Sequence, residues 1–239
     1  MLIKKISAKF SLVYFSIFIV IGINAPFFPL WLSSKGFTER YIAIILAASV
    51  LTKLLANPFF AGLGDKYGNR KIPMLYLSFI SIIILFSLNI FNSLYLIAFM
   101  AITSWALFAP LMPLTESLTT TAIKKYNFDY GNTRLWGSVS FIIIAFFGGL
   151  IIEQYGLKYV PILMTIGALF LFLSIVIMPT IPSLPARKKF STYALLKNRN
   201  FFPFLLACGA IQSSHGIYYG FSTIYWKSIG LSETIIGAL

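Results

Sequence analysis

Charged side chains are scarce in this sequence, and acidic ones are scarcest of all. Only 10% of the 239 residues are charged, and Asp and Glu together number 6. The single cysteine, Cys208, excludes an internal disulfide and stands in an apolar segment, where a small hydrophobic side chain is its expected role. This shortage of charge excludes an ordinary water-soluble domain. The hydrophobic content of 59% indicates instead a protein that lies in lipid.

Signatures of catalysis are missing as well. The sequence has no metal-ligand cluster, no phosphate-binding Gly-Lys-Ser/Thr loop and no Ser/His/Asp set. We therefore expect neither an enzyme nor an ATP-driven pump, and we expect no cofactor and no metal.

Apolar runs of membrane-crossing length recur along the chain. A spanning helix needs about 20 apolar residues, and such runs predict seven spans, at about 10–32, 41–61, 72–90, 94–122, 133–153, 158–179 and 201–226. The basic stretch before the first run resembles a secretion signal, but that run is too long to be cleaved, so it is expected to remain as a span. An eighth span is expected to begin after Ser232 and to be truncated, which makes the chain the N-terminal part of a longer protein.

Lysine and arginine gather in alternate connections between the predicted spans. With the N-terminus in the cytoplasm, 14 of the 19 lie inside: Lys4, Lys5, Lys9, Lys66, Arg70, Lys71, Lys124, Lys125, Arg134, Arg187, Lys188, Lys189, Lys197 and Arg199. Four lie outside, and Lys53 alone falls in mid-span. Because cytoplasmic loops are rich in basic residues, we predict a multi-pass inner-membrane protein with a cytoplasmic N-terminus. This explains the net charge of +13 better than nucleic-acid binding does.

The segment after the sixth predicted span differs in composition from both of its flanks. Three prolines and a cluster of basic residues lie between residues 179 and 200, which is typical of a linker. We therefore expect three parts. These are a six-helix bundle over 1–179, a basic cytoplasmic linker over 180–200 and the start of a second bundle over 201–239.

Two predicted spans carry prolines at the same spacing. Pro26 and Pro29 lie in the first span, and Pro110 and Pro113 lie in the fourth. In carriers built from inverted three-helix repeats, breaks at corresponding places lie near the central binding site. We therefore expect both spans to be interrupted in the same way, with ordinary proline kinks as the alternative.

The connection after the second span reads Gly62-Leu-Gly-Asp65-Lys-Tyr-Gly68-Asn-Arg70-Lys71. It resembles the loop 2 to 3 signature of the major facilitator superfamily, except that Ala61 replaces the first glycine. Gly68 permits a tight turn, and Asp65 can accept hydrogen bonds at a helix end. The resemblance implies that Asp65, Gly68 and Arg70 act as a cytoplasmic gate latch and do not bind substrate.

Further stretches resemble the lactose permease and phenylpropionate permease branches of that superfamily. They are Pro113-Leu-Thr-Glu116, Phe128-Asp-Tyr-Gly131 and Arg134-Leu-Trp-Gly137, together with Pro26 to Leu32 and Tyr218 to Trp226. The last is most similar to phenylpropionate permease, and the resemblance covers nearly the whole chain. It implies an all-α membrane protein, with an N-terminal six-helix bundle built as a 3+3 inverted repeat, a seventh span and a truncated eighth.

The resemblance also implies a substrate site. In lactose permease relatives, an acid and an arginine at the places of Glu116 and Arg134 hold sugar hydroxyls. A carboxylate and a guanidinium can pair across helices and reopen to bind polar groups. The alternative is that both only fix topology or lock their helices. Phe141 stands where lactose permease has the tryptophan that stacks on galactose, which argues against a galactoside.

Lys53 is the most informative single residue. A lysine at mid-membrane costs about 2.5–3.5 kcal/mol, so we expect a compensating partner, either Glu116 or the carboxylate of an aromatic acid substrate. Asn57 lies one turn further on the same face, and Asn24 lies beside the first proline pair, so both are candidate cavity residues. The alternative is a lysine whose side chain extends to the membrane interface.

Polar residues form a stripe in the seventh predicted span. Gln212 and His215 are followed one turn later by Tyr218. His215 is the only histidine and is, with Gln212, a candidate for proton or substrate contact. The alternative is a hydrogen-bonded packing residue.

Taken with the resemblance, these residues predict a secondary active transporter that carries a small organic solute by proton-coupled symport. We favour an aromatic carboxylate such as 3-phenylpropionate. A sugar or nucleoside proton symporter is one alternative, and a truncated remnant or half-bundle without transport activity is another. The expected partners are the substrate, a proton and the lipid bilayer, with no nucleic acid. Transport is expected to need a missing C-terminal bundle or a second copy of the chain.

Overall fold

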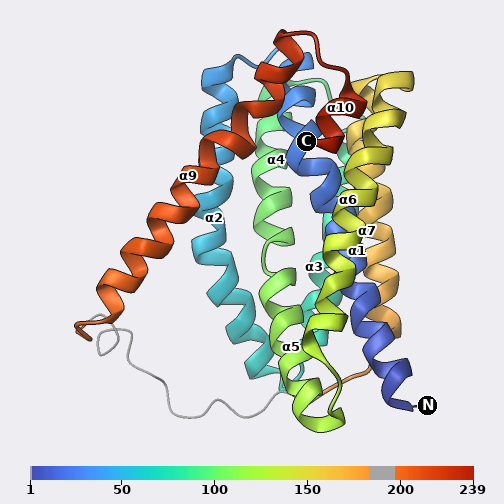
Figure 1. Cartoon of the computed structure of the whole chain (residues 1–239), viewed down its shortest axis with the longest axis vertical. Helices are drawn as coiled ribbons and strands as arrows, with labels where there is room; N and C mark the ends of the chain where they lie inside the picture. The colour runs from blue at the N-terminus through green and yellow to red at the C-terminus, as the bar shows by residue number, and fades with distance from the viewer. Residues whose placement is uncertain (1, 183–196) are drawn as a thin grey trace.

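Helices make up nearly all of the computed structural model, which describes residues 2–182 and 197–239, without the side chains of residues 217 and 219 (Figure 1). The helices are α1 (Leu2–Ser34), α2 (Glu39–Lys66), α3 (Lys71–Ser87), α4 (Leu94–Phe108), α5 (Leu111–Tyr126), α6 (Tyr130–Tyr155), the 3-10 helix η1 (Leu157–Tyr159), α7 (Val160–Ile177), α9 (Phe201–Ser228) and α10 (Glu233–Ala238). No strand occurs in the described ranges. The prediction of an all-α protein is confirmed.

In the described part, five helical stretches are long and apolar enough to cross a membrane. They are α1, α2, α4 with α5, α6, and η1 with α7, while α3 is apolar but shorter. Lipid offers the backbone no hydrogen-bond partners, so a spanning segment must satisfy its own, as a helix does. The first six predicted spans therefore correspond to α1 through α7, the seventh to α9, and the start of the eighth to α10.

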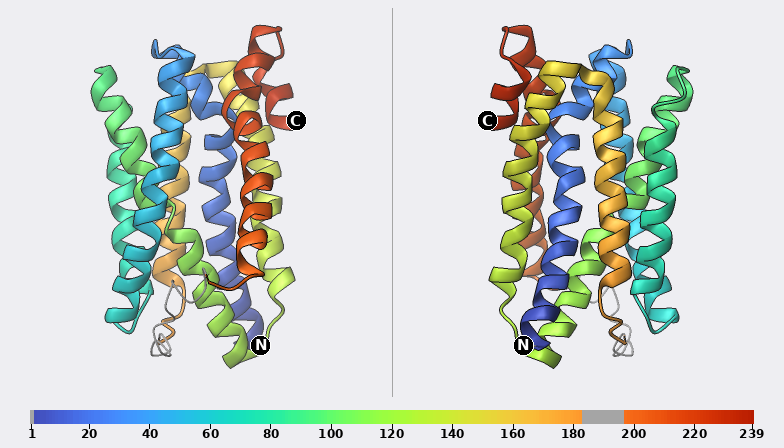
Figure 2. Two further views of the ribbon diagram at one scale, coloured as in Figure 1. Left: turned by 90° about the vertical axis from the view of Figure 1, so that its left-hand side faces the viewer. Right: turned by 90° about the vertical axis from the view of Figure 1, so that its right-hand side faces the viewer.

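The helices run side by side, and their connections gather at two opposite ends (Figures 1 and 2). One end, called here the N-terminal end, holds the N-terminus and the connections 67–70 and 127–129. The other, called here the far end, holds the connections 35–38, 88–93 and 229–232, and α10 lies near it. This alternation is what successive membrane crossings require.

Helix α1 is the scaffold of the bundle. It packs against α6 and α7 and contacts the last part of α9. Phe10, Tyr14 and Phe27 on α1 have no exposed surface at all. Helices in lipid are held together by close packing rather than by exclusion of water. A helix buried to this degree therefore fixes the positions of its neighbours.

The two proline pairs have different effects, so the prediction of matching interruptions is wrong for the first span. Pro26 and Pro29 lie inside α1, which continues without a break to Ser34. Pro110 stands between α4 and α5, where the helix is interrupted. Each proline removes one backbone hydrogen bond. Pro110 is buried, as Pro26 and Pro29 are, and buried Phe108 and Leu111 lie beside it, so the difference between the two pairs does not follow from local burial.

Within the described residues, helix α9 packs on the bundle through its second half. Side chains from 202 to 216 are exposed, and Figure 1 shows this part of α9 leaning away from α2. Beyond it, Thr223 is buried and α10 packs on α6. Most of the predicted linker, residues 183–196, lies outside the described residues, so the division into 1–179, 180–200 and 201–239 stays a prediction.

Candidate functional site

A cavity of about 730 Å³ opens between α1, α2, α4, α6 and α9. Five of the predicted site residues are in its wall: Asn24, Lys53, Phe141, Gln212 and His215. They come from four different helices, so no single stretch of sequence contains the site. The wall also includes Phe18, Ser49, Trp105 and Ser138, which sequence reasoning did not select.

Lys53 is placed in this cavity by α2. Its Nζ atom lies over the ring of Trp105, 4.8 Å from the ring centroid. Among the described residues, no carboxylate oxygen lies within 4.0 Å of the amine. The expected pairing with Glu116 is therefore not present in this structure. A cation–π contact returns about 2 kcal/mol when desolvated, less than the about 2.5–3.5 kcal/mol that a mid-membrane lysine costs.

Glu116 and Arg134 form an ion pair with each other. Arg134 Nε lies 3.3 Å from Glu116 Oε1, and the Tyr130 hydroxyl donates a hydrogen bond of 2.9 Å to Glu116 Oε2. The guanidinium also stacks on the rings of Phe18 and Tyr14, at 4.5 and 5.3 Å from the ring centroids. Arg134 thus has a charged partner and two aromatic ones.

The Glu116–Arg134 pair and the cavity are neighbours and not one site. Neither residue is in the cavity wall, whereas Phe18 contacts Arg134 and is in that wall. Space for this arrangement comes from Gly137, where an added Cβ would lie 2.8 Å from both Arg134 Nη1 and Phe18 Cδ2. The side chains of the pair are 27% and 29% exposed, so solvent can still reach them.

The predicted latch residues lie at the N-terminal end. Asp65 belongs to the last turn of α2, and its Oδ1 lies 2.7 Å from Nη2 of Arg70. Arg70 also donates a hydrogen bond to the Ser117 hydroxyl on α5. Gly68 adopts φ of +61°, a left-handed conformation that suits glycine. This cluster joins α2 to α5 around the turn, away from the cavity.

The remaining candidates differ in their surroundings. Asn24 is buried and its amide donates to Met164 Sδ over 3.9 Å, a long contact. Nδ1 of His215 lies 2.8 Å from the carbonyl oxygen of Ile211 on its own helix. Asn57 is not in the cavity wall, and its Oδ1 atom is buried without a hydrogen-bond partner in the described part. Lys53 and Asn57 therefore do not share the cavity as their spacing suggested.

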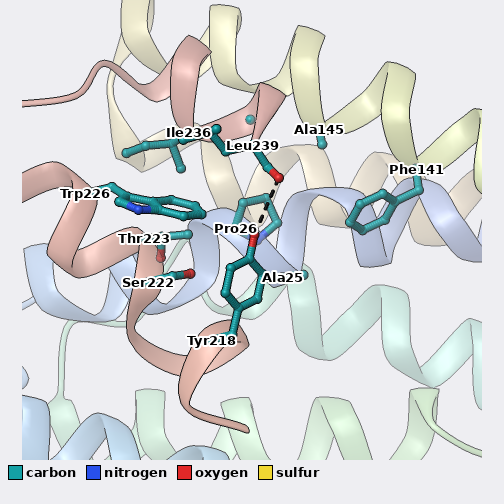
Figure 3. Close-up of a pocket in the computed structure, with 11 residues that line it drawn as sticks. Ala25, Pro26, Phe141, Ala145, Tyr218, Ser222, Thr223, Trp226, Ile236 and Leu239 are labelled. Carbon is teal, nitrogen blue, oxygen red and sulfur yellow. Dashed lines mark hydrogen bonds between the residues drawn. The ribbon is translucent and has the colours of Figure 1, made fainter. Parts of the chain in front are cut away.

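A smaller pocket of about 190 Å³ lies beside this cavity, toward the far end. Figure 3 shows Tyr218 and Trp226 from α9 next to Pro26 of α1, with the Tyr218 hydroxyl bonded to the carbonyl oxygen of Leu239. Ala25 and Phe141 belong to the walls of both spaces. The two cavities are therefore contiguous around these residues.

Helix α10 closes over α6 at the far end. Gly149 on α6 meets the Glu233 carbonyl, and Gly237 meets the Ala145 carbonyl, so closely that neither glycine has room for a Cβ. Glu153 Oε2 accepts a hydrogen bond of 3.0 Å from the Thr234 backbone, and Lys227 pairs with Glu233 at 2.7 Å. The two glycines and Glu153 therefore hold α10 on α6, and the Lys227–Glu233 pair joins α9 to α10.

A bundle of membrane-length helices around a cavity defines a class, the multi-pass helical membrane proteins. The model of the MFS_1 like family matches residues 7–239, and the chain belongs to this family. The predicted membership of the major facilitator superfamily is thereby confirmed.

Two sequence relatives and one solved structure show which proteins this chain resembles. The chain is 31% identical, over 96% of its length, to the probable 3-phenylpropionic acid transporter of Escherichia coli (strain K12), covering 62% of it. It is 28% identical to the lactose permease of Citrobacter freundii over 55% of its own length and 33% of that protein. The crystal structure of the nucleoside transporter NupG superposes with a TM-score of 0.75 at 16% identity, over 92% of this chain and 57% of that one. The predicted fold and branch are confirmed, and the chain spans about three fifths of the first and third of these proteins.

Proposed function

We propose that this chain forms part of a secondary active transporter that takes up an aromatic carboxylate, such as 3-phenylpropionate, by proton-coupled symport. The observation that carries the proposal is Lys53, a cation inside the cavity with no carboxylate within 4.0 Å among the described residues. An intramembrane charge without an acid partner is suited to an anionic substrate. The aromatic side chains of Phe18 and Phe141 suit the ring.

Other residues take supporting roles in this proposal. Asn24, Gln212 and His215 supply polar contacts, with His215 as the candidate for proton transfer. Asn57 contributes only if the cavity widens toward it. Asp65, Gly68 and Arg70 act as the latch of a cytoplasmic gate, and Glu116 with Arg134 binds polar substrate groups when their pair reopens.

The membrane orientation is part of the proposal. The N-terminal end carries Lys66, Arg70, Lys124 and Lys125 in or beside its connections, which supports a cytoplasmic position in an inner membrane. Two bundles that rock about a central site are needed for alternating access. The second bundle would come from further residues of the same protein or from a second copy of this chain.

A sugar or nucleoside symporter is the second candidate. The Glu116–Arg134 pair favours it, because a partly exposed carboxylate and guanidinium can both bind hydroxyl groups. Similarity to transporters along 96% of the chain favours either candidate over an inactive remnant.

Substitution of Lys53 separates these candidates. Uptake of labelled 3-phenylpropionate and of its neutral amide would be measured in proteoliposomes of the native protein. Lys53→Met is expected to abolish uptake of the anion and to spare the amide, whereas Lys53→Arg, the matched control, keeps the charge and part of the activity. Equal loss of both substrates in Lys53→Met would contradict the carboxylate role.

The mass of the native protein decides how the assay is assembled. A mass far above the 26.8 kDa of this sequence would place the second bundle on the same chain, and the assay then uses that chain. A mass of 26.8 kDa with uptake would require two copies, which a covalently joined tandem dimer would reproduce.

A further inference from the structure

Trp105 lies beside Lys53 in the cavity wall. It is in the last turn of α4, five residues before the proline that separates α4 from α5. Its ring packs edge-on against Phe108, with centroids 5.5 Å apart, and its face is turned toward Nζ of Lys53. Both side chains belong to the cavity wall. The ring is thus held rigidly where the ammonium lies.

The ring face and a carboxylate compete for this ammonium. An aromatic face is the negative side of the ring quadrupole, so it attracts a cation and repels an anion. A carboxylate that pairs with Lys53 next to Trp105 is therefore opposed by the ring. Arg134 keeps both kinds of partner because a planar guanidinium can stack by its face and pair by its edge. The ammonium of Lys53 is a compact point charge, so it gains less from each partner when it holds both.

The described part of the cavity wall offers Lys53 few other partners. Asn24, Gln212 and His215 are in the same wall, but Asn24 contacts Met164 and His215 contacts its own helix backbone. The acids Glu116 and Asp65 pair with Arg134 and Arg70. Within the described part of the wall, the recorded contact of the Lys53 ammonium is with the face of the Trp105 ring.

We propose that Trp105 sets the affinity of the site for organic anions, because its ring and a substrate carboxylate share one ammonium and each weakens the other's hold on it. This inference rests on the proposed function and names a residue that determines its specificity. The ring stabilises the lysine when no anion is bound, a state that a carrier must pass through after each release, and it weakens the pairing with a bound anion.

Replacement of the ring tests this exchange. In Trp105→Leu the anion has no competitor, so KM for 3-phenylpropionate is expected to fall about tenfold, which is part of the about 30-fold that a fully desolvated cation–π contact would supply. The maximal rate is expected to fall as well, because release and return of the empty site lose their stabilising partner. Kinetics for 3-phenylpropionamide are expected to stay within about twofold. Trp105→Phe, a weaker cation–π partner, is expected to lie between Leu and the wild type.

A rise in KM for the anion in Trp105→Leu would overturn the proposal, and so would an equal change for the anion and its amide. Either result would make Trp105 a packing residue. Trp136→Leu is the matched control, because Trp136 is half exposed on α6 and is not in the cavity wall. Its kinetics are expected to match those of the wild type.

A binding measurement separates this inference from the proposed transport. Acylation of Lys53 by an amine-reactive ester is followed by mass spectrometry, with increasing 3-phenylpropionate as the protecting anion. Half-maximal protection is expected at about tenfold lower concentration in Trp105→Leu than in the wild type. Tighter protection without uptake would leave the inference standing and overturn the transport proposal. Uptake with unchanged protection would do the reverse.

Discussion

Lys53 on α2 and Arg134 on α6 are two cations of the bundle, and they are compensated in different ways. Arg134 is paired with Glu116, whose other oxygen accepts from Tyr130, and it stacks on two rings. Lys53 has the face of one ring and a cavity in front of it. A charge neutralised within the protein can lock helices together. A charge left without an acid is available to a ligand, and this difference makes Lys53 the stronger candidate for a substrate contact.

An acid introduced beside Lys53 should pair with it, as Glu116 pairs with Arg134. Ser49 lies one turn before Lys53 on α2 and is in the cavity wall. An aspartate there would pair with the lysine at the favourable i, i+4 spacing. We expect Ser49→Asp to lower 3-phenylpropionate uptake at least about 100-fold, because a substrate carboxylate then meets an occupied lysine and a like charge worth several kcal/mol.

Ser49→Asn is the matched control, since it has the same size without the charge. Its uptake is expected to stay within about threefold of the wild type, and the neutral amide should be carried by both variants. Full anion uptake by Ser49→Asp would show that Lys53 does not hold the carboxylate. The distinction between the two cations would then disappear.

Removing the acid partner of Arg134 tests the same comparison at the second cation. Glu116→Gln leaves the guanidinium without its counter-charge, and we expect the free energy of unfolding in detergent to fall by about 1–2 kcal/mol. This lies between the values for exposed and buried pairs because both side chains are about a quarter exposed, at 27% and 29%. Denaturant titration of the purified protein measures the change.

The double variant Glu116→Gln, Arg134→Gln provides the control. A coupling of about 1 kcal/mol between the two substitutions is expected if the residues stabilise each other. Strictly additive losses would mean that the pair contributes nothing to stability. Arg134 would then be as available to a substrate as Lys53, which would favour the sugar or nucleoside reading.

The sequence was enough to locate Lys53 but not its partner. A single charge in an apolar run is visible without a structure, because its cost in lipid demands an explanation. Trp105 lies in a run where nearly every side chain is apolar, so no periodic pattern tells which face of α4 meets the cavity. The one available signal was its position just before the Pro110 break. Asn57 shows the opposite error, since shared helical phase with Lys53 did not bring it into the cavity wall.

The proline pairs mark a second limit of prediction from sequence. The lengths of the spans follow from the thickness of the bilayer, which any polytopic chain must match. Pro26 and Pro110 have the same local chemistry, yet only the second separates two helices. Both prolines are buried, so neither the local sequence nor the burial of the proline explains why only one of them separates two helices.

Gly137→Ala tests whether the two cations occupy separate sites. Its Cβ would lie 2.8 Å from Arg134 Nη1 and from Phe18 Cδ2, so both groups must shift. We expect the free energy of unfolding to fall by about 1 kcal/mol, at the low end for overpacking, because the guanidinium is the flexible end of its side chain. Gly131→Ala is the matched control, since its Cβ would meet only Asp129 Oδ1 at 3.4 Å, and it is expected to be neutral or slightly stabilising.

The transport kinetics of Gly137→Ala show whether the two cations act at separate sites. Phe18 touches Arg134 and is also in the cavity wall, so its displacement should raise KM for the anion by about two- to threefold, the scale of a small packing defect. An effect of this size fits a cavity whose wall is disturbed while Lys53 keeps its place. A rise of tenfold or more would mean that the Arg134 environment forms part of the anion site, and that the two cations act on one substrate together.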